Sequence, residues 1–128
     1  MKLLLDTHTF LWWDNEPERL STTAFDLCAD VENTLILSVV SVWEMQIKHQ
    51  LGRLQLRKEL RDLVASQRKH NKVKILSLSL EHIYSLSRLP FHHKDPFDPA
   101  LVAQTEADGL SLLSVDPIMR RYTHRVIW

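Results

Sequence analysis

The chain has 128 residues, of which 45% are hydrophobic, and its 16 acidic and 16 basic side chains give a formal net charge of zero. This length suits one domain, spanning residues 1–128, with a hydrophobic core that needs no disulfide. The single cysteine, Cys28, excludes an intramolecular disulfide and fits a buried apolar group in a reducing compartment. The opening MKLLLD is too short for a signal peptide, and no apolar run reaches membrane-spanning length, so we expect a cytoplasmic protein without membrane contact.

The first half of the chain alternates short apolar runs with helical patterns. In chain order these patterns predict a strand at 2–5, helices at 7–15 and 21–32, a strand at 35–37 and a helix at 41–52. The last of these helices takes Ser38 or Ser41 as its N-cap and has Trp43 on its apolar stripe. Asp6 and Thr7 follow the first strand directly, and either one suits the N-cap of the next helix. Asp6 is therefore expected at the carboxyl end of a buried strand.

The second half of the chain begins with a strongly basic helix. Its patterns predict a helix at 57–71, a strand at 73–78, helices at 80–89 and 97–108, a strand at 110–115, a short helix at 117–122 and a last strand at 125–128. Asp95-Pro96 and Asp116-Pro117 each resemble an N-cap followed by proline at the first helical position. This alternation predicts an α/β fold, namely a three-layer αβα sandwich around a short, mostly parallel central sheet.

Charge is distributed unevenly along the chain. The segment from Lys48 to Lys74 holds nine of the 16 Lys and Arg residues but two of the 16 acids, so it carries +7 and the remainder carries −7. A basic flank beside an acidic remainder suits a protein that binds a polyanion, although ordinary solvated helix faces explain the same pattern. Within this segment we select three candidate phosphate contacts: Arg68, Lys69 and Lys72.

Four acids come from separate segments, each just beyond a strand or in the opening turns of a helix: Asp6, Glu44, Asp98 and Asp116. The carboxyl ends of parallel strands share one edge of a sheet, where ligands bind in open α/β folds, so we expect these carboxylates to converge. Helix capping explains any one Asp-Pro pair equally well, and Lys48 offers Glu44 an ordinary helix partner. Gathered carboxylates repel unless a cation lies between them, and hard oxygen ligands favour Mg²⁺, with Mn²⁺ as a substitute.

Three stretches carry a resemblance to a known family: LLLDTHTFLWW, SVVSVWEMQIKHQLGRL and LPFHHKDPFDPALVAQTEADGLSLLSVDP. Together they resemble the PIN-domain ribonuclease toxins of the VapC type, which belong to type II toxin-antitoxin systems. In that family an Asp closes the first strand, a Glu lies on the helix after the second strand, an Asp opens the long late helix and an Asp follows the next strand. The matching positions here are Asp6, Glu44, Asp98 and Asp116.

The resemblance implies a metal-dependent endoribonuclease that hydrolyses RNA phosphodiester bonds with water activated by one or two Mg²⁺ ions. It implies that Asp6, Asp98 and Asp116 are metal ligands and that Glu44 is a ligand or a proton acceptor. It also implies auxiliary roles for Thr7, whose hydroxyl can form a hydrogen bond with a ligand carboxylate or a bound water, and for Asp95, the first acid of the DPFD variant.

The resemblance also implies three partners. The first is the RNA substrate, with Arg68, Lys69 and Lys72 as its phosphate contacts. The second is another copy of the chain in a homodimer. The third is a small cognate antitoxin that lies over the active site. Its candidate anchors are three aromatic side chains, Trp12, Trp13 and Trp43. The alternative is that all three are core residues, which we expect for Trp43.

The chain departs from the family pattern at two positions and adds a pair of histidines. Relatives often have Arg where this chain has Pro99, and Ala where it has Thr105. Pro99 favours a helix that begins at Asp98 rather than at Asp95, which would reorient the Asp98 carboxylate. His92 and His93 are adjacent in a loop without the spacing of a zinc site, so we interpret them as loop or substrate contacts.

Two other classes of protein compete with a nuclease. A receiver-type signalling domain has a similar length and fold, but it requires paired acids after the first strand and a late lysine that Asp6-Thr7 and Asp116-Pro117 do not supply. A catalytically silent PIN-like module that binds RNA is the stronger rival, because capping alone explains some of the aspartates. An RNA cleavage assay with and without EDTA separates this module from the enzyme.

Overall fold

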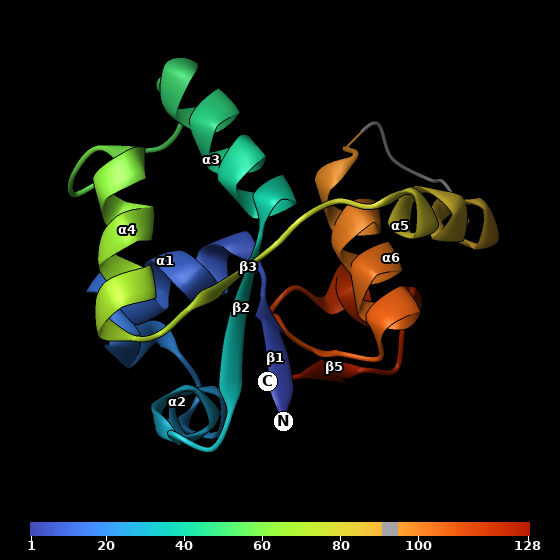
Figure 1. The fold of residues 1–128 in the computed structure, drawn as a ribbon, viewed down its shortest axis with the longest axis horizontal. Coiled ribbons are helices and arrows are strands. Elements are labelled where there is room, and N and C mark those ends of the chain that lie inside the picture. The colour runs from blue at the N-terminus through green and yellow to red at the C-terminus, as the bar shows by residue number, and fades with distance from the viewer. Residues whose placement is uncertain (91–94) are drawn as a thin grey trace.

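The computed structural model describes residues 1–90 and 95–128, and its strands form one parallel sheet (Figure 1). The five strands lie in the order β3-β2-β1-β4-β5. The central strand β1 (Lys2–Leu5) pairs with β2 (Thr34–Ser38) and with β4 (Ser111–Leu113), while β3 (Lys74–Leu76) and β5 (Val126–Ile127) form the edges. Every pairing is parallel, which confirms the predicted α/β class.

Helices cover both faces of this sheet and make the predicted three layers. Figure 1 shows α1, α2 and α4 to one side of the central strands and α5 and α6 to the other. Within the described residues, none of the helices is both long and apolar enough to cross a membrane. The helical segments are α1 (Thr7–Asn15), η1 (Pro17–Arg19), α2 (Thr22–Ala29), α3 (Val39–Gln50), α4 (Leu60–His70), α5 (Leu80–Ser85), η2 (Leu86–Arg88), α6 (Phe97–Asp108) and η3 (Pro117–Arg121), the η segments being 3-10 helices.

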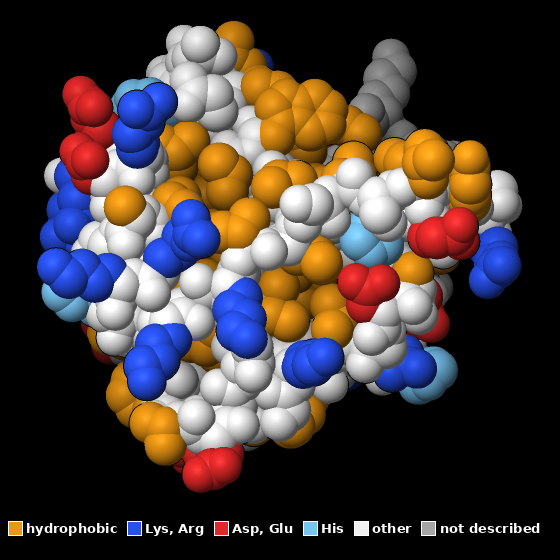
Figure 2. Space-filling view, in the orientation of Figure 1, with side chains coloured by type: hydrophobic (Ala, Val, Ile, Leu, Met, Phe, Trp, Pro, Cys, Tyr) orange, Lys and Arg blue, Asp and Glu red, His pale blue; other side chains and the backbone are white. Residues whose placement is uncertain are grey.

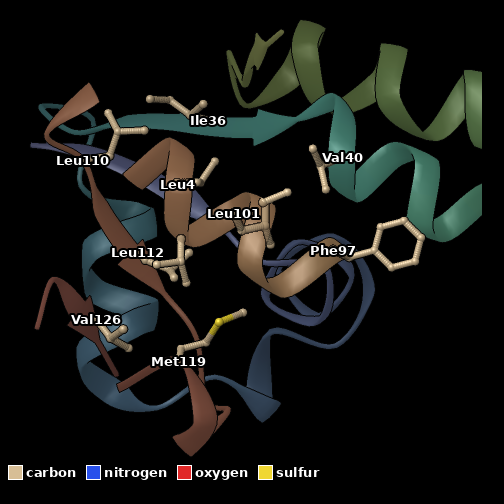
Figure 3. Packing of buried hydrophobic residues seen from close by; sticks show 11 residues of the cluster. Leu4, Ile36, Val40, Phe97, Leu101, Leu110, Leu112, Met119 and Val126 are labelled. Carbon is tan, nitrogen blue, oxygen red and sulfur yellow. The ribbon is translucent and has the colours of Figure 1, made fainter. Parts of the chain in front are cut away.

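Alternating side chains of the central strands build two hydrophobic cores, one on each face of the sheet. Leu4 of β1 and Leu112 of β4 belong to a cluster that includes α6, seen in Figure 3. Leu3 and Leu5 point the other way and pack with side chains from α1 to α4, among them Phe10. Because successive strand residues face opposite sides, the leucines of KLLL serve both cores. This double burial explains why the sequence has a continuous apolar run there.

Cys28 lies in the second of these cores, as the sequence predicted. Its side chain is buried and makes no disulfide. Burial raises the pKa of the Cys28 thiol to about 12, because the apolar surroundings disfavour the thiolate. The thiol therefore stays protonated at neutral pH and packs as a small apolar group.

Side-chain caps determine where the helices start. Asp6 accepts a hydrogen bond of 2.8 Å from the Thr9 N–H at the start of α1, so Asp6 rather than Thr7 is the N-cap. Ser38 accepts one of 3.0 Å from Val40 at the start of α3, and Ser41 lies inside that helix. Both caps directly follow strands. Each helix therefore begins at the carboxyl edge of the sheet.

Three sequence predictions need correction. The helix predicted at 21–32 ends at Ala29, and the helix predicted from residue 57 begins at Leu60. Arg57 lies before α4 instead, where its guanidinium donates across 3.2 Å to Asp14. Trp43 is 50% exposed, so it is no core residue, although its ring meets that of Phe97 edge to face at 4.9 Å. The apolar stripe that includes Trp43 predicted the helix correctly, but it predicted more burial of that helix by other elements than the structure has.

Candidate active site

Acidic side chains from four elements converge at the carboxyl edge of the sheet. Asp98, in the first turn of α6, has a pKa raised to about 7, first by burial and then by the negative charges of its acidic neighbours. Those neighbours, in order of decreasing effect, are Asp95, Glu44, Asp116 and Asp6. Three of these acids, Asp95, Asp98 and Asp116, also line one pocket. Glu44 and Asp6 lie near enough for their charges to act on Asp98.

Asp6 is the most deeply placed of the aspartates at 5% exposure. Burial raises its pKa, while hydrogen bonds from Ser114 and Thr9 oppose that rise by favouring the carboxylate. The strand β1 fixes the position of Asp6, and its cap of α1 fixes the direction of the side chain. Capping and site membership are compatible here, because one carboxylate oxygen satisfies the Thr9 N–H across 2.8 Å.

Glu44 is buried on the second turn of α3 and is held by two neighbours. The Thr7 hydroxyl donates to Glu44 Oε1 across 2.5 Å, and the Lys48 ammonium forms an ion pair with Oε2. The sequence suggested a Glu-Lys helix pair as the alternative to a functional role for Glu44, and the structure contains that pair within the acid cluster. Lys48 supplies a positive charge that partly offsets the gathered carboxylates.

Asp95 and Asp98 are placed by the start of α6. The Asp95 side chain accepts a 2.8 Å hydrogen bond from the Phe97 N–H, and the helix begins at Phe97. The start at Asp98 that Pro99 favoured is therefore wrong. Pro99 lies in the first turn instead, where a missing N–H costs no helical hydrogen bond. Asp98 consequently has a helical backbone and projects from the first turn.

Asp116 completes the cluster from the loop after β4. Its carboxylate accepts a 3.0 Å hydrogen bond from the Ile118 N–H and caps η3, which places proline at the first helical position as predicted. A pocket of about 170 Å³ opens between α6 and η3, with Asp95, Asp98 and Asp116 on its polar side. The predicted helix at 117–122 is thus a 3-10 segment, and its Tyr122 forms another wall of this pocket.

The sequence did not single out Ser114 and Ser41, although both lie near the acids. The Ser114 hydroxyl accepts a 3.1 Å hydrogen bond from the Asp116 N–H and also bonds to the Asp6 side chain, so it connects two of the aspartates. Ser41 lies one turn before Glu44 in α3, and its buried hydroxyl has no hydrogen-bond partner among the described residues. Ser114 lies two residues before Asp116 at the end of a strand, and this position could have identified it from the sequence. For Ser41 the sequence gives only its position in SVVSVWE, three residues before Glu44.

The donor set fits a hard divalent cation. All the candidate ligands are carboxylates, and burial together with the charges of neighbouring acids raises the pKa of Asp98. The buried Ser41 hydroxyl, one turn before Glu44, has no hydrogen-bond partner among the described residues. Over residues 1–90 and 95–128, no three Asp, Glu, His or Cys side chains are already close enough to hold an ion. A cation would have to draw the carboxylates together.

The three predicted phosphate contacts lie away from these acids. Arg68 and Lys69 are in the last turn of α4, and Lys72 precedes β3 with a positive φ of 54°. Lys72 lines a pocket with Asn33 and Thr34, which are at the amino edge of the sheet. Figure 2 shows Lys and Arg side chains gathered over α4 and across the lower part of this face. Lys72 and the acids thus occupy opposite ends of the strands, whereas Arg68 lines a pocket between α3 and α4 with Val42 and Gln46.

The remaining sequence candidates have simple positions. Thr105, one of the two departures from the family pattern, is buried in α6. Its hydroxyl donates a 2.8 Å hydrogen bond to the Leu101 carbonyl, so its hydrogen-bonding partner lies within the same helix. Trp12 and Trp13 are half-buried on α1. His92 and His93 lie outside the described residues, and their proposed role as loop or substrate contacts stays a prediction.

Comparison with known protein families identifies the chain. The model of the PIN domain matches residues 3–125, which is nearly the whole sequence. This chain is a PIN domain. The receiver-type signalling fold considered from the sequence is therefore wrong. No curated protein sequence matches this PIN domain.

Solved structures with the same fold come from toxin-antitoxin complexes. A chain of VapBC2 from Rickettsia felis, solved with a promoter DNA fragment, has a TM-score of 0.68 at 13% identity and covers 99% of this PIN domain and 96% of its own length. A chain of VapBC-1 from nontypeable Haemophilus influenzae has a TM-score of 0.63 at 14% identity, covering 94% and 91%. A chain of FitAcB from Neisseria gonorrhoeae has a TM-score of 0.59 at 16% identity, covering 98% and 96%. At these identities the likeness is one of fold.

Proposed function

We propose that this PIN domain is a metal-dependent endoribonuclease that acts as the toxin of a toxin-antitoxin pair. The observation that carries the proposal is the grouping of acids around Asp98, whose pKa is raised to about 7 by burial and by the charges of its acidic neighbours. A cluster of carboxylates at the ligand-binding edge of a parallel sheet, offset in part by Lys48, suits a nuclease that positions a cation against a phosphodiester. Membership of the PIN domain family also supports a nuclease function.

The chain's own carboxylates would hold the cation. We assign the ligand role to Asp6, Asp98 and Asp116, with Glu44 as a further ligand or as the acceptor of a proton from water. When bound, Mg²⁺, or Mn²⁺ in its place, supplies a Lewis acid that activates water and offsets charge on the phosphate. Asp95 then has an auxiliary role, since it fixes the start of α6 and adds negative charge beside Asp98.

Several residues position these acids without contacting the substrate. Thr7 and Lys48 restrain the Glu44 carboxylate from two sides, and Ser114 connects the side chain of Asp6 to the backbone of Asp116. A carboxylate that is held in one orientation loses less freedom when it accepts a proton or an ion. Pre-positioning of this kind supports a catalytic function more than a purely structural one.

The proposed partners follow from the solved structures with this fold. Because those chains come from complexes named VapBC, FitAcB and toxin-antitoxin, we propose a cognate small antitoxin that covers the acid pocket, and RNA as the substrate. We also propose a homodimer in a cytoplasmic location. Light scattering at tens of micromolar protein tests the dimer, and a clean monomer at that concentration would contradict it.

An RNA cleavage assay with a matched control variant tests the activity. Purified protein should cut single-stranded RNA in millimolar Mg²⁺ and stop when EDTA is added. Asp98→Asn should lower the rate by several orders of magnitude, because it removes a proposed ligand. Asp26→Asn, which alters an exposed acid on α2, should leave the rate unchanged. A protein that binds RNA in all three forms but never cuts it would instead be the catalytically silent RNA-binding module.

A further inference from the structure

A groove lined by α1 includes His8, which follows Asp6 by two residues in the chain. It has a volume of about 190 Å³ and runs between α1, η1 and the 54–57 segment that leads into α4. Leucine side chains make up much of its lining, including Leu11, Leu54 and Leu63. Four aromatic or cationic side chains line the same groove: His8, Trp12, Arg19 and Arg57.

His8 connects this groove to the acids. It lies two residues after Asp6, in the first turn of α1, and its side chain is exposed. Asp6 caps α1, and His8 lies in the first turn of that helix, so His8 is the part of the groove lining next to Asp6 in the chain. From His8 the groove follows α1, which Figure 1 shows leaving the end of β1 and running toward α4.

Aromatic rings and cations are interleaved along the groove. The His8 ring lies 5.9 Å from that of Trp12 at a tilt of 43°, and Trp128 meets Trp12 edge to face at 6.0 Å. The Arg19 guanidinium lies over the Trp12 ring, 4.4 Å from its centroid. Trp12 is thus fixed by its neighbours, while His8 remains the exposed ring of the group.

The acids that line this groove are already paired. Asp14 accepts from Arg57 across 3.2 Å and from Gln67 across 2.8 Å, and its side chain is 3% exposed. Glu16 forms a 3.5 Å ion pair with Arg19. Asp14 is thus shielded from the groove, whereas the Glu16 carboxylate is 47% exposed and its charge is offset by Arg19. The other exposed charged or titratable groups on the groove are an imidazole and the outer parts of two guanidinium groups, which repel no phosphate.

We propose that this groove is a subsite for one nucleotide of single-stranded RNA next to the bond that is cut, with the base stacked on His8 and the flanking phosphate near Arg19. Stacking on an exposed aromatic ring beside a cation is how proteins bind single strands without reading their sequence. The inference rests on the proposed function, because it takes RNA as the substrate. It also assigns a role to the aromatic rings and guanidinium groups along α1, which differ from the basic residues predicted as phosphate contacts.

Binding of RNA to His8 variants tests the subsite without any cleavage. Affinity for a fluorescent single-stranded RNA of mixed sequence is measured in EDTA, in an Asp98→Asn background. His8→Ala should weaken binding by about fivefold or more, the lower end for one base stacked on an aromatic ring. His8→Phe should restore most of the affinity, because it keeps the ring and loses only the nitrogens. His70→Ala, an exposed histidine at the end of α4, is the matched control and should bind like the parent.

Arg19 gives a second, independent measurement. Arg19→Gln should reduce the slope of log affinity against log salt by about 0.7, as expected for one phosphate contact on a single strand. Arg88→Gln, an exposed arginine on η2, should not change the slope. Both variants alter exposed side chains, so circular dichroism should show an unchanged fold.

The outcomes separate the subsite from the enzyme. If His8→Ala weakens binding while the wild-type protein never cuts RNA, the subsite stands and the proposed nuclease activity fails. If His8→Ala binds RNA like its parent, the subsite is wrong, whether or not RNA is cut. The proposal is equally overturned if the variant lowers only the rate at saturating RNA, which would place His8 at the chemistry. Loss of antitoxin binding alone would assign the groove to a protein partner.

Discussion

The Thr7 hydroxyl donates a hydrogen bond to Glu44 Oε1 across 2.5 Å, which joins the first turn of α1 to the second turn of α3. Both helices leave neighbouring parallel strands, β1 and β2, whose register pairs Leu5 with Leu37. The bond therefore fixes how two adjacent strand ends present their acids. The contact with a carboxylate is one that we expected of Thr7, and its auxiliary role at the site stays a prediction.

Removing this hydroxyl should affect both stability and activity. Thr7→Val keeps the shape but leaves Glu44 Oε1 without its partner, which should cost about 1–3 kcal/mol of unfolding free energy. The cleavage rate at saturating RNA should fall while RNA affinity stays unchanged. Thr7→Ser keeps the donor and should recover most of both losses. Urea denaturation and single-turnover cleavage measure the effects, and a Thr7→Val protein as active as wild type would contradict the positioning role.

Divalent cations should stabilise the folded protein. A ligand that binds only the folded state stabilises it by mass action, and the unfolded chain has no gathered carboxylates. Millimolar Mg²⁺ or Mn²⁺ should therefore raise the melting temperature of wild type, whereas Asp6→Asn should remove the shift. Asp26→Asn, on an exposed part of α2, should keep it. A wild-type protein that cuts RNA in the presence of metal yet shows no thermal shift would argue against the proposed metal site.

The titration of Asp98 should make stability depend on pH in the absence of metal. Its pKa is about 7 in the folded protein and near 3.8 ordinarily, so between these values the folded state keeps a proton that the unfolded chain has lost. Unfolding free energy should consequently fall as pH rises from about 4 to about 7 and then level off. Asp98→Asn should remove this fall, because asparagine does not titrate.

Comparison of wild type with Asp98→Asn isolates this effect from the other titrating groups. At pH 8 in EDTA the asparagine variant should be the more stable by on the order of 2 kcal/mol, a figure reduced from the full shift because the side chain is partly exposed. Near pH 4 the difference should vanish. Urea denaturation at a series of pH values gives both numbers. Equal stabilities at pH 8 would show that the acids around Asp98 do not repel it.

Much of the fold followed from local patterns. The run KLLL predicted a buried strand, and Asp116-Pro117 predicted a helix start with proline at its first position, because burial on both faces and a fixed proline φ leave few alternatives. Asp95-Pro96 marked the start of α6 only approximately, since Pro96 rather than Asp95 is its N-cap. Gly109 predicted the end of α6, where the chain has a φ of 64° that glycine adopts without strain. These signals depend on neighbours in the sequence, and they survived in the folded chain.

Features that depend on distant segments could not be predicted in the same way. Trp43 matched a helical stripe, but its exposure depends on how much of α3 other elements cover. The pairing of Arg57 with Asp14, which are 43 residues apart, delayed the start of α4. In the sequence, Ser114 is only a serine in a predicted apolar strand, and its hydrogen bond with Asp6 depends on the fold. Charge counting found the basic segment, but gave no indication that Lys72 lies at the opposite edge of the sheet.

That separation sets a test of whether the basic segment and the acids contribute independently to one activity. Reversal of Arg68, Lys69 and Lys72 to Glu should weaken RNA binding and flatten its salt dependence, because phosphate contacts release counterions. Cleavage at saturating RNA should remain nearly intact, since none of the three side chains lines the pocket that contains Asp98. Asp98→Asn should do the opposite, with RNA still bound and cleavage lost by several orders of magnitude.

Affinity and single-turnover rate, measured for both proteins, decide the matter. An RNA that contacts Lys72 and the acids at once must extend along the whole length of the strands, so a short oligonucleotide should be insensitive to the triple reversal and a long one sensitive. If binding of RNA of every length is unchanged, these three side chains only solvate the end of α4 and the turn after it. An Asp98→Asn protein that cleaves at the wild-type rate would overturn the catalytic assignment itself, because Asp98 is one of the proposed metal ligands and lines the acid pocket.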